Sequence, residues 1–123
     1  MRLPELRNLI RQGETEPVEF KTKVNHPEKI VKEIVAFANT KGGKLLLGVS
    51  DQGQLLGLSA THEAVYTLEA AIAKYCFPEI NFHREIIPLT AKRSIIIYTI
   101  FESEFKPHYT LFSKHKKHRQ EYI

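Results

Sequence analysis

The sequence predicts an α+β fold with a mixed, mainly antiparallel sheet packed with two long helices. Three observations lead to this prediction. Two segments, 27–41 and 61–76, repeat apolar residues at helical spacing. Apolar runs of strand length stand at 44–49 and 94–101. The order along the chain is helix, strand, helix, hairpin, helix and then strands, which is typical of the α+β class.

The first elements are a short helix and a half-buried strand. Apolar residues at helical spacing, ended by Gly13, predict an opening helix, and they are Leu3, Leu6, Leu9 and Ile10. From Pro17 to Lys23 apolar and charged residues alternate. A strand here places Val18 and Phe20 on one face and Glu19, Lys21 and Lys23 on the other.

The first long helix and a buried strand come next. Pro27 and Glu28 suit a first helical turn, because proline has the required φ and a carboxylate favours the positive end of the helix dipole. Two glycines, Gly42 and Gly43, end this helix. The run 44–49 is nearly all apolar, which predicts a central strand covered on both faces. A tight turn at 50–53 returns the chain into 54–58, which predicts a hairpin.

The second long helix spans 61–76 and stops before Pro78. Two strands, 80–87 and 94–101, follow it, and a hairpin of 109–112 with 120–123 closes the chain. Cys76 falls on the apolar face of the helix, so we expect a small buried hydrophobe and not a nucleophile.

The positive charge is confined to one end of the sequence. Residues 1–104 hold 13 Lys or Arg against 13 Asp or Glu, whereas residues 105–123 hold five against one, which accounts for the formal charge of +4. A single cysteine excludes an internal disulfide framework, and no apolar stretch has the length of a membrane span. We therefore expect a cytoplasmic chain with no membrane contact. Its 123 residues suit one domain, and the strand-like end at Tyr122 suggests the N-terminal part of a longer protein.

Acidic residues form the first candidate site. Glu14, Glu16 and Glu19 are close in sequence, and Asp51 sits on a turn that reaches them if the two strands are neighbours. Three carboxylates in one cleft would hold magnesium or manganese and activate water against a phosphodiester. The alternative is structural: Asp51 suits a tight turn, and the glutamates are solvated loop residues.

The segment 39–44 forms a second candidate site. Gly42 and Gly43 would let backbone amides approach a phosphate, with Lys41 and Lys44 beside it, or they would simply end a helix. A nucleotide P-loop is excluded, because Val49 stands where that motif needs lysine.

The third candidate is the basic tip of the last hairpin. Lys114, Lys116, Lys117 and Arg119 would neutralise phosphates along a nucleic-acid backbone, or they would serve as soluble surface. His115 and His118 have a spacing that binds zinc only on a helix, and we expect no helix there.

Taken in order, four blocks of the sequence resemble the Schlafen AlbA-like domain family, a family associated with DNA binding. They are ETEPVEFK at 14–21, IVAFANTKGG at 34–43, LGVSDQG at 47–53 and LGL at 56–58. The resemblance covers nearly the whole chain from about Leu6. It implies an AlbA-like fold at the N-terminal end of prokaryotic regulators or ATP-dependent helicase-like proteins.

The resemblance also implies site residues. In Schlafen proteins that cleave RNA the catalytic acids fall on positions matching Glu14, Glu19 and Asp51 of this sequence, while Ser50 stands where the family has the first aspartate of the turn. Such nucleases build their groove from two similar lobes, which a single domain would supply by dimerising.

The sequence thus leaves three hypotheses. The first is a nucleic-acid-binding domain of a regulatory or helicase-like protein, which needs no cofactor and contacts DNA or RNA through basic residues: Lys21, Lys23, Lys41, Lys44, Lys114, Lys116, Lys117 and Arg119. The second is a magnesium- or manganese-dependent endoribonuclease that uses Glu14, Glu19 and Asp51. The third is a dimerisation module that serves an ATP-binding C-terminal domain of the same longer chain, for example in a transcriptional regulator.

Overall fold

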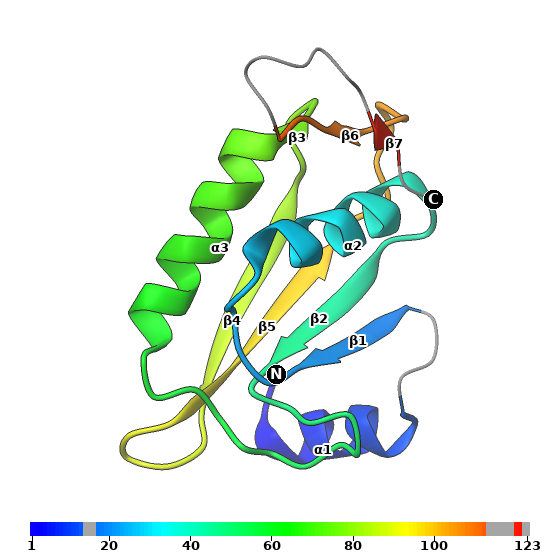
Figure 1. Ribbon diagram of the computed structural model, residues 1–123. Helices are drawn as coiled ribbons and strands as arrows, with labels where there is room; N and C mark the ends of the chain where they lie inside the picture. The colour runs from blue at the N-terminus through cyan, green and yellow to red at the C-terminus, as the bar shows by residue number, and fades with distance from the viewer. Residues whose placement is uncertain (14–16, 113–119, 122–123) are drawn as a thin grey trace.

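The computed structural model describes residues 1–13, 17–112 and 120–121 (Figure 1). Ten elements follow one another in this part of the chain: α1 (Leu3–Arg11), β1 (Val18–Lys21), α2 (Pro27–Asn39), β2 (Gly43–Leu47), α3 (Thr61–Tyr75), β3 (Cys76–Phe77), β4 (Phe82–Pro88), β5 (Ser94–Ile100), β6 (Tyr109–Thr110) and β7 (Gln120–Glu121). None of the helices in this part of the chain has the length and apolar composition of a membrane span.

The main sheet has four strands in the order β1-β2-β5-β4. β1 and β2 are parallel, while β2–β5 and β4–β5 are antiparallel, so the predicted mixed, mainly antiparallel sheet is confirmed. The two central strands are the most apolar in the sequence, GKLLL and SIIIYTI, because helices or loops cover both of their faces.

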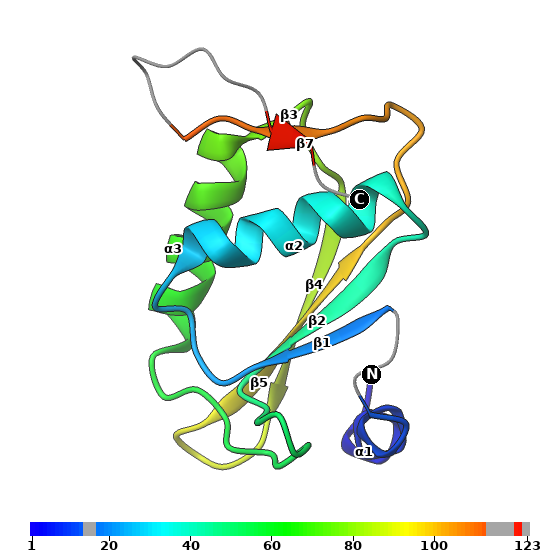
Figure 2. The same cartoon turned by 45° about the vertical axis from the view of Figure 1, so that its right-hand side comes forward.

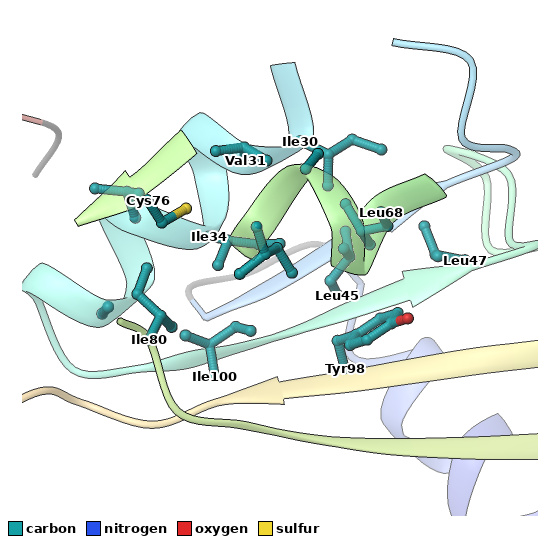
Figure 3. Close-up of a cluster of buried hydrophobic side chains, with 14 of the residues drawn as sticks. Ile30, Val31, Ile34, Leu45, Leu47, Leu68, Cys76, Ile80, Tyr98 and Ile100 are labelled. Atoms are coloured by element: carbon teal, nitrogen blue, oxygen red, sulfur yellow. The ribbon is translucent and has the colours of Figure 1, made fainter. Parts of the chain in front are cut away.

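Helices lie on both faces of this sheet (Figure 2). On one face α2 and α3 pack on alternate residues of β2 and β5 such as Leu45, Leu47 and Tyr98, which form the larger core (Figure 3). On the other face α1 packs through Leu6 on Leu46 and its neighbours. The prediction of two long helices is therefore incomplete, because the nine-residue α1 supplies the cover of the second face.

Two glycines, one between α2 and β2 and one at the first position of β2, allow the end of the helix to approach the sheet closely. Gly42 has φ +83°, and a Cβ there would stand 2.6 Å from the Ile100 carbonyl oxygen. The N–H of Gly42 donates to the Phe37 carbonyl at 2.8 Å, and a Cβ on Gly43 would meet the Phe37 ring. The structure thus uses these glycines to end the helix, and the Gly42 amide is not turned toward a ligand.

The predicted hairpin at 44–58 is wrong in its second half. Segment 54–58 forms single bridges, Val49–Leu55 and Leu58–Ser94, and no strand. The reason is that Gly48 and Gly57 both have positive φ and lie against each other, which bends the chain out of extended conformation.

The turn itself is present, but Ser50 organises it. The Ser50 carbonyl accepts the Gly53 N–H at 2.9 Å, and its hydroxyl accepts the Gln54 N–H at 3.0 Å. Asp51 is therefore the second residue of the turn and is exposed to solvent.

A second, smaller sheet has the order β3-β6-β7 (Figure 1). The pairing of β6 with β7 confirms the predicted closing hairpin. The strand β3, which pairs with β6 directly after α3, is not predicted by the sequence. Cys76 belongs to β3 and is 3% exposed, and burial raises the pKa of its thiol to about 12, so it is a buried apolar residue as expected.

Candidate nucleic-acid interface

Two lysines and two aromatic rings from three separate segments meet beside β6, and we call this set the basic-aromatic corner. It consists of Lys32 on α2, Lys74 and Tyr75 on α3, and Phe112 after β6. The rings of Tyr75 and Phe112 lie 4.9 Å apart between centroids at 51°. Lys32 Nζ stands 5.8 Å from the centre of the Phe112 ring, and Lys74 Nζ 5.3 Å from that of Tyr75. The negative face of an aromatic ring attracts an ammonium without neutralising its charge.

The end of α3 and the strand β6 hold this corner together. β3 and β6 pair in the register Cys76–Thr110 and Phe77–Tyr109, and the two rings of the second pair lie 6.0 Å apart. The pairing continues where the Leu111 N–H donates to the Tyr75 carbonyl at 2.9 Å. Phe112 is therefore fixed against the last turn of α3, where a lysine also suits the negative end of the helix dipole.

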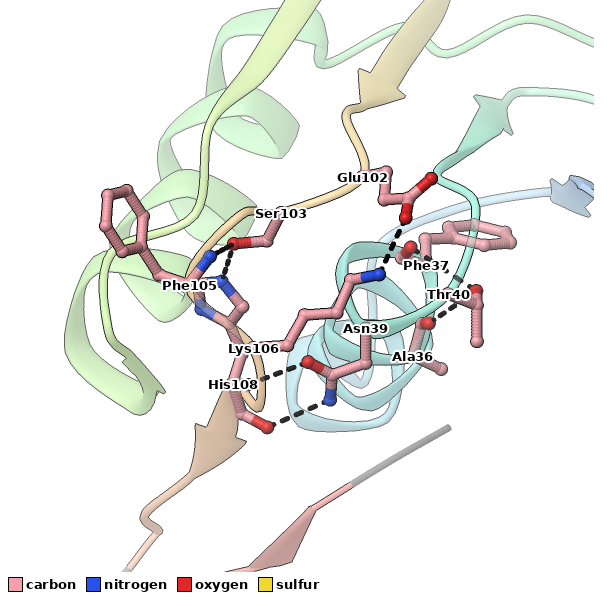
Figure 4. Close-up of polar contacts among 9 residues, drawn as sticks. All are labelled: Ala36, Phe37, Asn39, Thr40, Glu102, Ser103, Phe105, Lys106 and His108. Atoms are coloured by element: carbon pink, nitrogen blue, oxygen red, sulfur yellow. Dashed lines mark hydrogen bonds and ion pairs between the residues drawn. The ribbon is translucent and has the colours of Figure 1, made fainter.

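A buried polar contact ties the chain before β6 to α2 (Figure 4). The Asn39 side chain accepts the His108 N–H at 2.7 Å and donates to the His108 carbonyl at 3.0 Å. One amide thus satisfies both backbone groups of a residue that is 1% exposed.

The imidazole of His108 is also fully bonded. Nδ1 lies 2.7 Å from the Pro78 carbonyl, to which it must donate, and Nε2 forms a hydrogen bond with the Ser103 hydroxyl. The Ser103 oxygen in turn accepts the Phe105 N–H at 3.0 Å. His108 is thus a structural residue that locks the segment leading into β6.

The predicted basic tip adjoins the corner in the sequence. Lys114, Lys116, Lys117 and Arg119 lie outside the described residues, and so do His115 and His118. The described residue Phe112 precedes this segment, and β7 follows it. The sequence did not indicate Lys32 and Lys74 as partners of this segment, because the link depends on the two-residue strand β3.

The remaining predicted lysines fall in different places. Lys23 and Lys41 are exposed. Lys21 lies between two carboxylates, with Nζ 2.9 Å from Glu33 Oε1 and 3.8 Å from Glu19 Oε1, so its charge is largely compensated. Lys44 is half-buried and donates to Thr99 Oγ1 at 2.8 Å.

The structure describes two of the three predicted metal-binding carboxylates, Glu19 and Asp51. Glu19 lies on the α2 side of β1 beside Lys21, while the turn of Asp51 packs through Gly53 against α1. Glu14 lies outside the described residues. Among residues 1–13, 17–112 and 120–121 no group of three His, Cys, Asp or Glu could hold a metal ion. The metal site remains a prediction.

Comparison with known proteins gives two findings. A family model described as Schlafen, AlbA_2 matches residues 14–123. The fold is similar to the solution NMR structure of the N-terminal domain of a RecG-related protein from Nitrosomonas europaea, a protein named for its relation to an ATP-dependent DNA helicase. That similarity has a TM-score of 0.73 at 18% identity and covers 100% of this chain and 89% of the other. Among curated protein sequences, none matches.

Proposed function

The chain belongs to the Schlafen, AlbA_2 family, and on that premise we propose that it is a nucleic-acid-binding domain of a longer protein. It contacts the phosphate backbone of DNA or RNA without strong sequence preference. The observation that carries this proposal is the basic-aromatic corner, where two lysines over aromatic rings adjoin a segment with four further basic residues. Backbone contacts of this kind give affinity without reading bases.

The chemistry of the corner suits a flexible polyanion. Lysines that neutralise phosphates release condensed counterions, which drives binding. Basic side chains interleaved with aromatic rings are typical of surfaces that bind single strands. The fold of the RecG-related domain supports the proposal, because that domain is the N-terminal part of a protein named for a DNA helicase. ATP binding and a role in transcription belong, in this proposal, to the C-terminal domain of the same longer chain.

The experiment measures affinity by fluorescence anisotropy with labelled DNA and RNA, single- and double-stranded, of one length, from 50 to about 300 mM salt. The wild type is compared with Lys32→Gln/Lys74→Gln and with Lys116→Glu/Lys117→Glu. The matched control is Lys92→Gln, an exposed lysine on the turn between β4 and β5. We expect each double variant to weaken binding and to lower the salt slope by about 0.9 for each phosphate that the variant no longer neutralises. If the double variants bind with the same affinity as the control, the basic-aromatic corner is not the interface.

Nuclease activity is the alternative and is tested in the same preparation. Structured RNA is incubated with manganese and either the wild type or Glu19→Ala. Cleavage by the wild type alone would support a metal site that includes Glu19, with Glu14 and Asp51 as further ligands. Equal cleavage by both proteins would indicate a contaminating nuclease.

A further inference from the structure

A row of polar side chains crosses the main sheet on the α1 side, and we call it the polar row. The strand register pairs Lys44 of β2 with Thr99 of β5, and Thr99 with His83 of β4. Paired residues on neighbouring strands project from the same face of a sheet. Lys44, Thr99 and His83 therefore stand side by side on three consecutive strands.

The position of this row relative to α1 leaves it open to solvent. The next row of the same face contains Leu46 and Ile97, which are buried beneath Leu6 of α1. On β2, β5 and β4 the face thus changes from apolar to polar at this row, whereas Val18, the partner of Lys44 on β1, is buried. His83 is exposed, and Lys44 and Thr99 are half-buried. The row lies at the end of the sheet nearest to β6 and β7 (Figures 1 and 2).

The donors of the row make no ion pair with a carboxylate of the described residues. Lys44 Nζ donates to the neutral Thr99 hydroxyl at 2.8 Å, and no ion pair among the described residues involves Lys44. Having accepted this bond, the hydroxyl has its own proton to donate, and the His83 ring supplies an N–H.

The carboxylate of Glu85, on the same face as the row, is already engaged. It accepts a hydrogen bond from the terminal ammonium of Met1, and this bond lowers the pKa of Glu85 against the opposing effect of burial. Weaker attractions to His83 and Lys44 lower the pKa of Glu85 further, and no hydrogen bond or ion pair joins this carboxylate to either side chain within the described residues. An anion that approaches the row from solvent would meet one ammonium and two further donors on rigid strands.

We propose that the polar row binds one phosphate group of the nucleic-acid backbone, on the face of the sheet opposite to α2 and α3. This inference rests on the proposed function and adds a second contact to it. The three donors are held by three strands, so they need little ordering when a phosphate binds. The nucleic acid then contacts the domain at the basic-aromatic corner and, around the end of the sheet, at the row.

The test compares oligonucleotide binding by Lys44→Gln, His83→Gln and Lys92→Gln, with folding checked by circular dichroism. Lys92 is the matched control, because five residue pairs, about 16 Å of strand, separate its turn from the row. We expect Lys44→Gln to weaken binding about three- to tenfold and to lower the salt slope by about 0.9, and His83→Gln to weaken binding about twofold. Equal affinities for Lys44→Gln and Lys92→Gln would overturn the inference.

A second measurement separates this inference from the proposed function. The wild type is titrated with inorganic pyrophosphate, and amide shifts are followed by NMR. Saturable shifts at Lys44, His83 and Thr99 that Lys44→Gln abolishes are the expected result. If these amide shifts appear while no oligonucleotide binds, the proposed function is wrong and the phosphate site is supported. If they are absent, the phosphate site fails even where oligonucleotides bind at the corner.

Discussion

Replacing Asn39 by alanine removes the contact that holds the chain before β6 against α2. The side-chain amide makes two hydrogen bonds, of 2.7 and 3.0 Å, to the N–H and carbonyl of His108. His108 is buried, so water cannot replace these bonds without opening the structure. Asn39→Ala therefore leaves two buried backbone groups without their partner.

The magnitude follows from these two bonds. A net hydrogen bond contributes about 1 kcal/mol, and a buried group left without a partner costs about 1–3 kcal/mol. We expect Asn39→Ala to lower the free energy of unfolding by about 2–4 kcal/mol, the lower value applying if the segment 101–112 relaxes. For a domain of this size that corresponds to a fall in Tm of about 6–15 °C.

Urea unfolding followed by circular dichroism measures the change. Lys41→Ala is the matched control, because it truncates an exposed side chain two residues from Asn39. Its loss of stability should be smaller than that of Asn39→Ala. A loss below about 0.5 kcal/mol for Asn39→Ala would show that these two hydrogen bonds do not hold the segment, since ordinary surface substitutions have effects of that size.

Three further predictions concern the core and the turns. Tyr98→Phe removes the hydrogen bond from the Tyr98 hydroxyl to Glu69 Oε2 at 2.9 Å, and we expect the free energy of unfolding in urea to fall by about 1–2 kcal/mol. An unchanged free energy of unfolding would contradict this hydrogen bond. Gly42→Ala should lower the free energy of unfolding more than Gly13→Ala, because both glycines have positive φ but only Gly42 has backbone within 3 Å of an added Cβ. Equal losses for the two variants would show that this close approach is absent. The pKa of Cys76 is raised to about 12, so iodoacetamide should alkylate the folded protein slowly at pH 8.5 and the protein in guanidinium fast; rapid labelling of the folded chain would contradict the burial of Cys76. Because the thiol ionises at lower pH in the unfolded chain, the free energy of unfolding should fall as pH rises above about 8.5.

Periodicity and turn residues were sufficient to predict the main sheet and its helices. The alternation around Val18 and Phe20 predicted β1, and the nearly all-apolar run 44–49 predicted a central strand, which is β2. The apolar run 94–101 predicted the strand β5 without its place in the sheet. These patterns are local and result directly from burial on one or both faces. The confirmed elements of the main sheet are those whose burial pattern extends over four or more residues.

What the sequence did not predict depends on contacts between distant residues. The strand β3 has two residues, too few for a pattern, yet it brings Phe112 to Tyr75 and so builds the basic-aromatic corner. The polar row appears only once the register is known, because Lys44 and His83 are far apart in sequence. The segment 54–58 was predicted as a strand because its apolar residues match one, while the positive φ of Gly57 decides its path.

In the proposed function, the chain binds nucleic acid through the phosphate backbone of the DNA or RNA. The most direct test is the dependence of its binding constant on salt concentration, measured with one single-stranded and one double-stranded oligonucleotide. We predict that log K falls linearly with log salt, by about 0.7–0.9 for each phosphate neutralised, and that a change of base sequence has little effect. Binding that is independent of salt, or no binding at low salt, would contradict it.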